Sequence, residues 1–193
     1  MKKLQQIVLA IIIVSFTSCA SYSNKISKGN QSKLTKTTIH KIEGVYEYEP
    51  FKSMGERGKN TYNIDNDVEQ LDFYILGTRM PLNPAKHTVT VKVISKDKVS
   101  FTFKRENKFV FERTIKMKLK SNGFLHLKNR HVKVKGIPLL VGGIMSDKMR
   151  IGISEDNDLL LNYAYDNFGS LIFMTAGNSY NRTHFYKKIN ALP

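Results

Sequence analysis

The sequence contains few of the residues that build a covalent or metal-bound framework. Its 193 residues include one cysteine, Cys19, and no tryptophan. A single thiol excludes an intramolecular disulfide and the cysteine-rich ligand sets of structural zinc sites. The five histidines form neither an H-x-H nor an H-x-x-x-H pair. We therefore expect no metal site and no cofactor.

Motifs that mark catalytic machinery are also missing. The chain has no G-x-S-x-G nucleophile elbow and no glycine-rich phosphate loop between a predicted strand and a predicted helix. The acidic stretch at 155–158 lacks the glycine and the distal glutamate of an EF-hand loop, and a polar turn accounts for it. We predict no catalytic residues and a non-enzymatic protein, with an unrecognised hydrolase as one alternative.

Long apolar runs are absent too, because a bilayer-spanning helix needs about 20 apolar residues. The run from Ile7 to Phe16 has the length of a signal-peptide core, and Lys2 and Lys3 supply the positive charge before it. Residues 16–19 then read Phe-Thr-Ser-Cys. An apolar residue, two small residues and a cysteine resemble the lipobox of bacterial lipoproteins, in which the first position is usually leucine.

The lipobox resemblance implies a signal peptide over residues 1–18 and a diacylglyceryl group on the sulfur of Cys19. The new amino group usually carries a further acyl chain, such as palmitate, and two or more chains hold a protein stably on a membrane. A plain secretory signal with an incidental Cys19 is the alternative. Ala20 replaces the aspartate that retains lipoproteins at the inner membrane of Gram-negative bacteria. We expect the periplasmic face of the outer membrane.

The residues after Cys19 predict a linker followed by one domain. Residues 19–40 are rich in Ser, Thr, Asn and Lys and contain no acidic residue, which is typical of a flexible tether. Residues 41–190 have a normal length for a single domain. We predict a lipidated flexible tether over 19–40 and a β-barrel domain over 41–190.

The chain is strongly basic, with a formal net charge of +15. Loss of Lys2 and Lys3 with the signal peptide would lower the charge to +13 (15 − 2). A basic surface suits a phosphate-bearing partner. Nucleic-acid sites favour arginine, but here lysines far outnumber arginines. We therefore expect lipid headgroups rather than nucleic acid, and an AT-rich genome is the alternative explanation of the lysines.

From residue 87 onward, polar and apolar residues alternate with the period of two that is typical of strands. Short polar links separate these strands and favour antiparallel neighbours. The links lie at 95–98, 105–108, 121–123, 146–148, 155–158 and 166–169. We predict an all-β fold: an antiparallel meander of roughly 8–10 strands that closes into a barrel and so removes its open edges. One short helix near 65–76 would cover an open end.

Gly44-Val45-Tyr46 resembles the G-x-W or G-x-Y start of lipocalin-like (calycin-type) barrels. The whole chain also resembles uncharacterised all-β envelope lipoproteins. A barrel of this size encloses room for side chains or for one small ligand. The apolar alternation gives the inward candidates for such a cavity: Phe101, Phe103, Phe111, Met117, Leu119 and Leu127. A strand opener and a core aromatic explain Gly44 and Tyr46 equally simply.

Lysines gather on two successive predicted strands. Lys116, Lys118 and Lys120 share one side of the first strand, and Lys128 and Arg130 follow on the next. If Leu119 and Leu127 face inward together, Lys118 lies opposite Lys128, and Lys116 opposite Arg130. Like charges opposed across strands are unfavourable, so this side is either a solvated face or a contact for anionic lipid headgroups.

These observations predict a membrane-anchored, non-enzymatic lipoprotein that binds an apolar or amphipathic ligand in its barrel. The alternative is a structural or interaction module of the envelope with a filled core. Both would show the same alternation along their strands. An internal void open at one end favours ligand binding, and a filled interior favours the interaction module. The sequence identifies no protein partner and no oligomeric state.

Overall fold

The computed structural model describes residues 22–57, 60–64, 69–77, 87–129, 131–137, 141–172 and 174–189. The predicted signal peptide and two predicted site residues, Cys19 and Arg130, lie outside this part of the chain. The described residues form mostly antiparallel strands with one short α-helix, so the prediction of an all-β fold is confirmed.

In the described part of the chain, thirteen strands are connected in one sheet. Their bounds, with those of the 3-10 helix η1 and the α-helix α2, are β1 (Gln31–Ser32), η1 (Ile39–Ile42), β2 (Gly44–Glu47), β3 (Lys52–Arg57), β4 (Asn60–Asn63), α2 (Leu71–Leu76), β5 (His87–Ser95), β6 (Lys98–Arg105), β7 (Lys108–Leu119), β8 (Leu125–Leu127), β9 (His131–Ile137), β10 (Val141–Ser154), β11 (Leu159–Leu171), β12 (Met174–Tyr186) and β13 (Lys188–Ile189).

The strand order is β13-β2-β5-β6-β7-β8-β10-β11-β12-β3-β4, with β1 and β9 also paired to β10. The sheet is not closed, so closure into a barrel stays a prediction. The first and last parts of the described sheet nevertheless lie side by side. The amide of Glu47 donates to the carbonyl of Lys187 at 2.9 Å, and the amide of Phe51 donates to the carbonyl of Phe185 at 3.0 Å. The segment that joins β2 to β3 therefore runs alongside the segment that joins β12 to β13.

The core lies on one face of this curved sheet, which we call the inner face. Alternation places Val89, Val91 and Val93 on it from β5, and Phe101 and Phe103 from β6. Each of these side chains is at most 8% exposed. They pack in one cluster with buried residues of β7, β8, β10, β11 and α2. The period-two pattern thus identified the buried face of these strands correctly.

Helix α2 is shorter than the predicted helix near 65–76. It spans Leu71–Leu76, and residues 65–68 lie outside the described chain. Leu71, Tyr74 and Ile75 are buried in the core cluster. The helix ends where Gly77 adopts the left-handed conformation (φ 76°) and its amide donates to the carbonyl of Phe73. Glycine adopts this conformation without a steric penalty.

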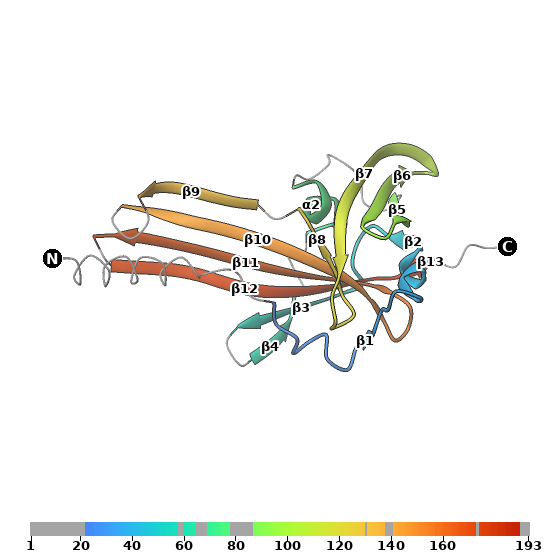
Figure 1. Ribbon diagram of the computed structural model, residues 1–193, viewed down its shortest axis with the longest axis horizontal. Helices are drawn as coiled ribbons and strands as arrows, with labels where there is room; N and C mark the ends of the chain where they lie inside the picture. The colour runs from blue at the N-terminus through green and yellow to red at the C-terminus, as the bar shows by residue number, and fades with distance from the viewer. Residues whose placement is uncertain are drawn as a thin grey trace.

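Four strands continue beyond the core as a flat extension, which we call the arm (Figure 1). It comprises residues 131–137, 141–148, 164–171 and 174–181, in the order β9-β10-β11-β12. The predicted turns at 146–148 and 166–169 are wrong, because both stretches lie inside strands. Ser146 pairs directly with Asp166 in a ladder that runs without a break from Val141 to Ile153.

The segment before β2 is docked on the body, and the prediction of a flexible tether over 19–40 is wrong for its described part. Ile26 and Leu34 are 3% and 2% exposed. Ile26 packs in a small cluster with Phe124, Leu160 and Phe185. Strand β1 pairs with the end of β10. The apolar residues scattered through this polar segment gain more by burial than the chain loses in freedom.

Candidate functional site

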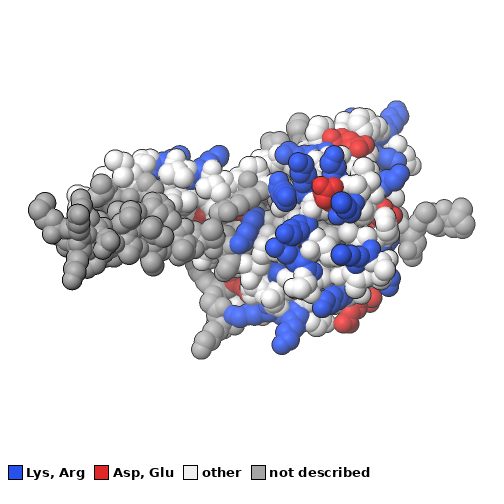
Figure 2. All heavy atoms as spheres, in the orientation of Figure 1, with Lys and Arg blue, Asp and Glu red and all other residues white. Residues whose placement is uncertain are grey.

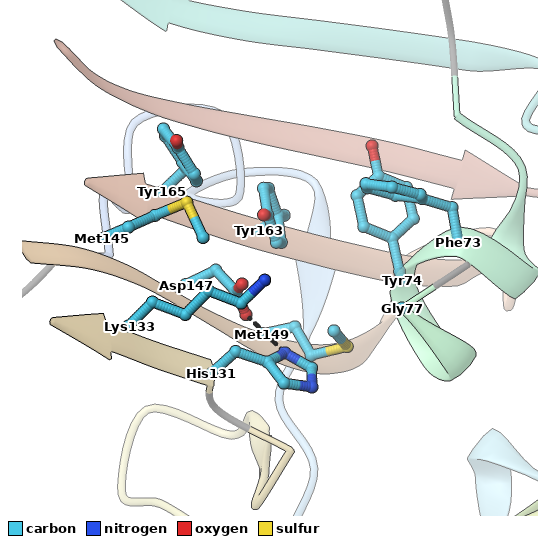
Figure 3. Close-up of a pocket in the computed structure, with 10 residues that line it drawn as sticks. All are labelled: Phe73, Tyr74, Gly77, His131, Lys133, Met145, Asp147, Met149, Tyr163 and Tyr165. Atoms are coloured by element: carbon cyan, nitrogen blue, oxygen red, sulfur yellow. Dashed lines mark hydrogen bonds and ion pairs between the residues drawn. The ribbon is translucent and has the colours of Figure 1, made fainter. Parts of the chain in front are cut away.

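A pocket of about 300 Å³ opens where the arm leaves the body (Figure 3). Helix α2 forms one wall, and the inner faces of β9, β10 and β11 form the others. Its lining residues are Phe73, Tyr74, Gly77, His131, Lys133, Met145, Asp147, Met149, Tyr163 and Tyr165. We call it the arm-root pocket.

Strand alternation places these side chains together. Asp147 lies directly opposite His131 on one side and Tyr165 on the other. Residues opposed across antiparallel strands share a face, so this row of three points into the pocket. Lys133 and Met145 form the next row towards the end of the arm. The pocket is therefore an extension of the inner face beyond the packed core.

The mouth of the pocket carries its polar groups. The Nδ1 atom of His131 lies 3.2 Å from Oδ1 of Asp147. The His131 side chain is 47% exposed, whereas that of Asp147 is 15% exposed. Lys133 lies one row away on the same face. An entering ligand would therefore meet a cation, an imidazole and a carboxylate at the solvent side of the pocket.

Aromatic rings form the deeper wall. The ring centres of Tyr74 and Tyr163 lie 5.1 Å apart. Beside them, the rings of Tyr165 and Tyr180 stack at 4.9 Å with an interplanar angle of 25°. Burial raises the pKa of Tyr163, and the charge of Asp147 raises it further. Burial also raises the pKa of Tyr74. These hydroxyls therefore stay protonated and act as neutral hydrogen-bonding groups on an otherwise apolar wall.

A buried hydrogen-bond chain fastens α2 to the sheet behind this wall. The hydroxyl of Tyr74 lies 2.7 Å from Nε2 of His184, and the hydroxyl of Ser53 lies 2.8 Å from its Nδ1. His184 is 0% exposed. Burial, with a smaller contribution from the charge of Arg182, lowers the pKa of His184 to about 3. The imidazole is therefore neutral at physiological pH. Sequence reasoning missed this link because it joins three distant segments.

The predicted cavity residues do not line the arm-root pocket. Phe101, Phe103, Met117 and Leu127 are at most 4% exposed and belong to the packed core cluster, against which Leu119 packs half-buried. Phe111 lies on the inner face as predicted, but it is 41% exposed and is not part of the packed core. The pairing of β6 with β7 has a register irregularity just after Phe103, which lies opposite Phe111. The interior predicted from alternation is therefore filled with side chains at these positions.

The predicted lysines do form an exposed face. Lys116, Lys118, Lys120 and Lys128 are all exposed. The predicted register was wrong by two residues, because Met117 lies opposite Leu127 and Lys118 opposite His126. Lys98 of β6 lies opposite Lys116. We call Lys98, Lys116, Lys118, Lys120 and Lys128 the lysine face, and Figure 2 shows basic side chains spread over the body on the side in view.

No match was found to a family model, a curated protein or a solved structure. Function is therefore argued from the site and not from relatives. Among the described residues, no group of three His, Cys, Asp or Glu side chains could hold a metal ion. Within the same part of the chain, no helix combines the length and apolar character needed to cross a membrane.

Proposed function

We propose that the protein is a lipid-anchored bacterial envelope protein that binds an amphipathic molecule in the arm-root pocket. The observation that carries this proposal is the division of the pocket into an apolar wall and a polar mouth. Its volume of about 300 Å³ lies at the lower end of the range for small-molecule sites. A single acyl chain or a compact apolar ring system matches that size.

The division of the lining indicates how such a molecule would lie. Its apolar part would contact Phe73, Met149 and Tyr163 beneath α2. Its head group would remain at the mouth, where Lys133 can pair with an anion and His131 can donate a hydrogen bond. Asp147 contacts His131 from the same face, so it fixes the position of the imidazole at the mouth.

The proposal is one of binding and not of catalysis. Ser53 and His184 lie within hydrogen-bond distance, as a nucleophile and its base would. Both side chains are buried, at 6% and 0% exposure, and neither lines the pocket. The Nε2 atom of His184 is moreover engaged by Tyr74. This pair therefore supports a structural role, and we assign no catalytic residues.

The envelope location rests on the lipobox resemblance at Cys19 and on the absence of an aspartate at position 20. We propose the periplasmic face of the outer membrane. Acylation at Cys19 would hold the protein at a surface rich in amphipathic molecules. The location and the pocket therefore support the same class of ligand.

A tryptophan reporter can test the pocket, because the natural chain contains no tryptophan. In the Phe73→Trp variant, titration with lauric acid should shift and strengthen the tryptophan emission as the chain enters the pocket. Dodecanol, which lacks the carboxylate, should bind more weakly. The matched control is Phe111→Trp, at an exposed position outside the pocket. An unchanged emission from Phe73→Trp, or equal changes in both variants, would contradict the proposal.

A second candidate, an interaction module of the envelope, is favoured by a different observation. The residues predicted to line a cavity pack together in a filled core. Among the described residues, no strand pairs with the outer edge of β9 or with residues 174–180 of β12, and the arm contributes to that core only at its root. Native mass spectrometry of protein purified from its own envelope separates the two candidates. A co-purifying lipid supports ligand binding, whereas a ligand-free chain that retains a protein partner supports the module.

A further inference from the structure

The described chain begins at one defined point on the sheet. The ring of Tyr22 lies under two cations of β10, with its centre 4.5 Å from Cζ of Arg150 and 4.8 Å from Nζ of Lys148. It also contacts the ring of His126 at 4.9 Å. The guanidinium of Arg150 donates to the carbonyl of Ser23 at 2.7 Å and to Oδ1 of Asn24 at 2.8 Å. These contacts hold residues 22–24 on the sheet.

These contacts lie on the outer face of the sheet, opposite the arm-root pocket. Arg150 pairs with His126, and His126 pairs with Lys118 of the lysine face. Residues opposed in this way share a face. Tyr22, three positions after Cys19, therefore lies on the same face as the exposed lysines.

Along the arm the outer face is apolar and exposed at β9, whereas Ile144 and Phe168 on β10 and β11 are half-buried and Ser146 is 3% exposed. Val134, Ile144 and Phe168 lie directly opposite one another on β9, β10 and β11. Val132 and Val134 are 49% and 58% exposed. The next residues on the same strands, including Lys133 and Met145, line the pocket on the inner face. Asp166 is the one acidic side chain among the described residues of the arm's outer face.

We propose that this outer face, from the lysine face to the valines of β9, lies flat against an anionic lipid bilayer. The inference rests on the proposed acylation of Cys19, and it adds the orientation in which the anchored protein is held. The lysines would meet lipid phosphates, and Val132 and Val134 would enter the headgroup region. The pocket on the inner face would then open away from the bilayer surface.

Chain length excludes the main rival orientation. The end of the arm is also apolar, because Ile137, Val141, Leu171 and Met174 form one exposed row. Lys148 lies seven residue steps along β10 from Val141, which is about 24 Å. Tyr22 lies three residue steps after Cys19, and these steps reach at most about 11 Å. An arm standing on its end would therefore lift the acylated cysteine out of the bilayer.

The bilayer also suits this face better than a second copy of the chain does. Antiparallel pairing of two β9 edges centred on Val134 would oppose Lys133 of each copy to Lys135 of the other, and like charges opposed in this way are unfavourable. Deep insertion is equally unsuitable, because the described residues leave the outer edges of β9 and β12 in the arm unpaired and lipid cannot satisfy such edges. Shallow contact through one face meets neither difficulty.

Adjacent residues on β9 supply a matched pair of probes. Val134→Cys and Lys135→Cys point to opposite faces of the same strand. In the acylated full chain the sulfur of Cys19 is a thioether, so each variant has one thiol for a polarity-sensitive maleimide fluorophore. The labelled chains are placed in vesicles of phosphatidylglycerol and phosphatidylethanolamine that contain a lipid with a nitroxide near its head group.

We expect the nitroxide to quench the Val134 probe severalfold more than the Lys135 probe. Equal quenching of the two probes would overturn the proposed orientation. Stronger quenching at Ile172→Cys, beyond the end of the arm, than at Val134→Cys would do the same and would indicate end-on contact.

The wild-type chain distinguishes this failure from failure of the proposed function. If the wild type itself reacts with the maleimide, Cys19 is not acylated and the proposed anchor is wrong. The two probes are then compared in a Cys19→Ser background added to the same vesicles. Selective quenching at position 134 would still support contact through this face, and its absence would overturn it.

Discussion

The guanidinium of Arg150 lies between two rings, 4.5 Å from the centre of Tyr22 and 4.0 Å from that of Phe124. Its Nε atom donates to Oδ1 of Asn162 at 2.8 Å. Arg150 is 1% exposed, and burial lowers its pKa to about 10, so it remains charged at physiological pH. One buried cation thus joins the start of the described chain to the centre of the sheet.

Replacing this cation should release the N-terminal segment. In Arg150→Met, the carbonyl of Ser23 and Oδ1 of Asn162 lose their donors, and each buried acceptor left unpaired costs about 1–3 kcal/mol. We expect the free energy of unfolding, measured with urea, to fall by about 2–4 kcal/mol. Backbone amides over residues 22–30 should exchange hydrogen faster. Lys148→Met, which removes a cation from the same ring, should cost less than about 1 kcal/mol. Unchanged exchange in Arg150→Met would contradict the docking.

The filled core predicts a sharp difference between two phenylalanines. Phe101 is 0% exposed and Phe111 is 41% exposed. Phe101→Ala should lower the free energy of unfolding by about 3–5 kcal/mol, because a buried ring leaves a cavity. Phe111→Ala should lower it by less than about 1 kcal/mol. Similar losses in chemical denaturation would show that the interior around Phe101 is not packed.

His184 should make stability depend on acidity. Its pKa falls from about 6.5 in the unfolded chain to about 3 in the folded protein. Between those values only the unfolded chain takes up the proton. The free energy of unfolding therefore decreases as the pH falls from 6.5, by at most about 1.4 kcal/mol per pH unit. This contribution is constant above pH 6.5.

The matching variant is His184→Gln, which cannot titrate. It should be less stable than the wild type at pH 7 but should lose less further stability down to pH 4. Burial also lowers the pKa of His126, to about 4, so part of the slope will persist. If urea unfolding shows that the free energy of unfolding depends on pH with the same slope in wild type and variant, His184 is not a source of the acid sensitivity.

The lysine face should control contact with an anionic leaflet. Each lysine close to such a surface contributes about 1 kcal/mol. The double variant Lys118→Gln, Lys120→Gln should therefore lower the equilibrium constant for bilayer contact by about thirtyfold. This constant is obtained from the fraction of Val134 probe that is quenched. High salt should have the same effect on the wild type. Lys133→Gln, Lys135→Gln removes equal charge from the inner face and should leave the quenching unchanged; equal loss would contradict the assignment.

Local hairpins were predictable because their signal is local. The links at 95–98 and 105–108 join β5 to β6 and β6 to β7 as expected. The arm was not predictable, because the polar stretches at 146–148 and 166–169 have the composition of turns. Their partners across the sheet, and not their own residues, keep them in strands. The exposed Val132 and Val134 have the same alternation as a buried face, so periodicity alone does not distinguish an exposed apolar face from a buried one.

The N-terminal segment and the pocket show two further limits. Residues 22–40 have a linker's composition, and their docking depends on single residues such as Ile26 and on a distant arginine. The arm-root pocket combines α2 with three strands from the second half of the domain. Alternation along one strand gives the face of a residue but not where the core ends and a pocket begins. The sequence predicted that Lys116, Lys118, Lys120 and Lys128 lie on an exposed side, which the structure shows, but it missed Lys98 and the register.

The most direct test of the account is the intact mass of the protein extracted from bacterial membranes. We predict a chain that begins at Cys19 and carries the added mass of a diacylglyceryl group, with a further acyl chain on its amino group. The Cys19→Ser variant should lose this mass and leave the membrane fraction. A processed chain that begins elsewhere, or one with an unmodified Cys19, would contradict the account.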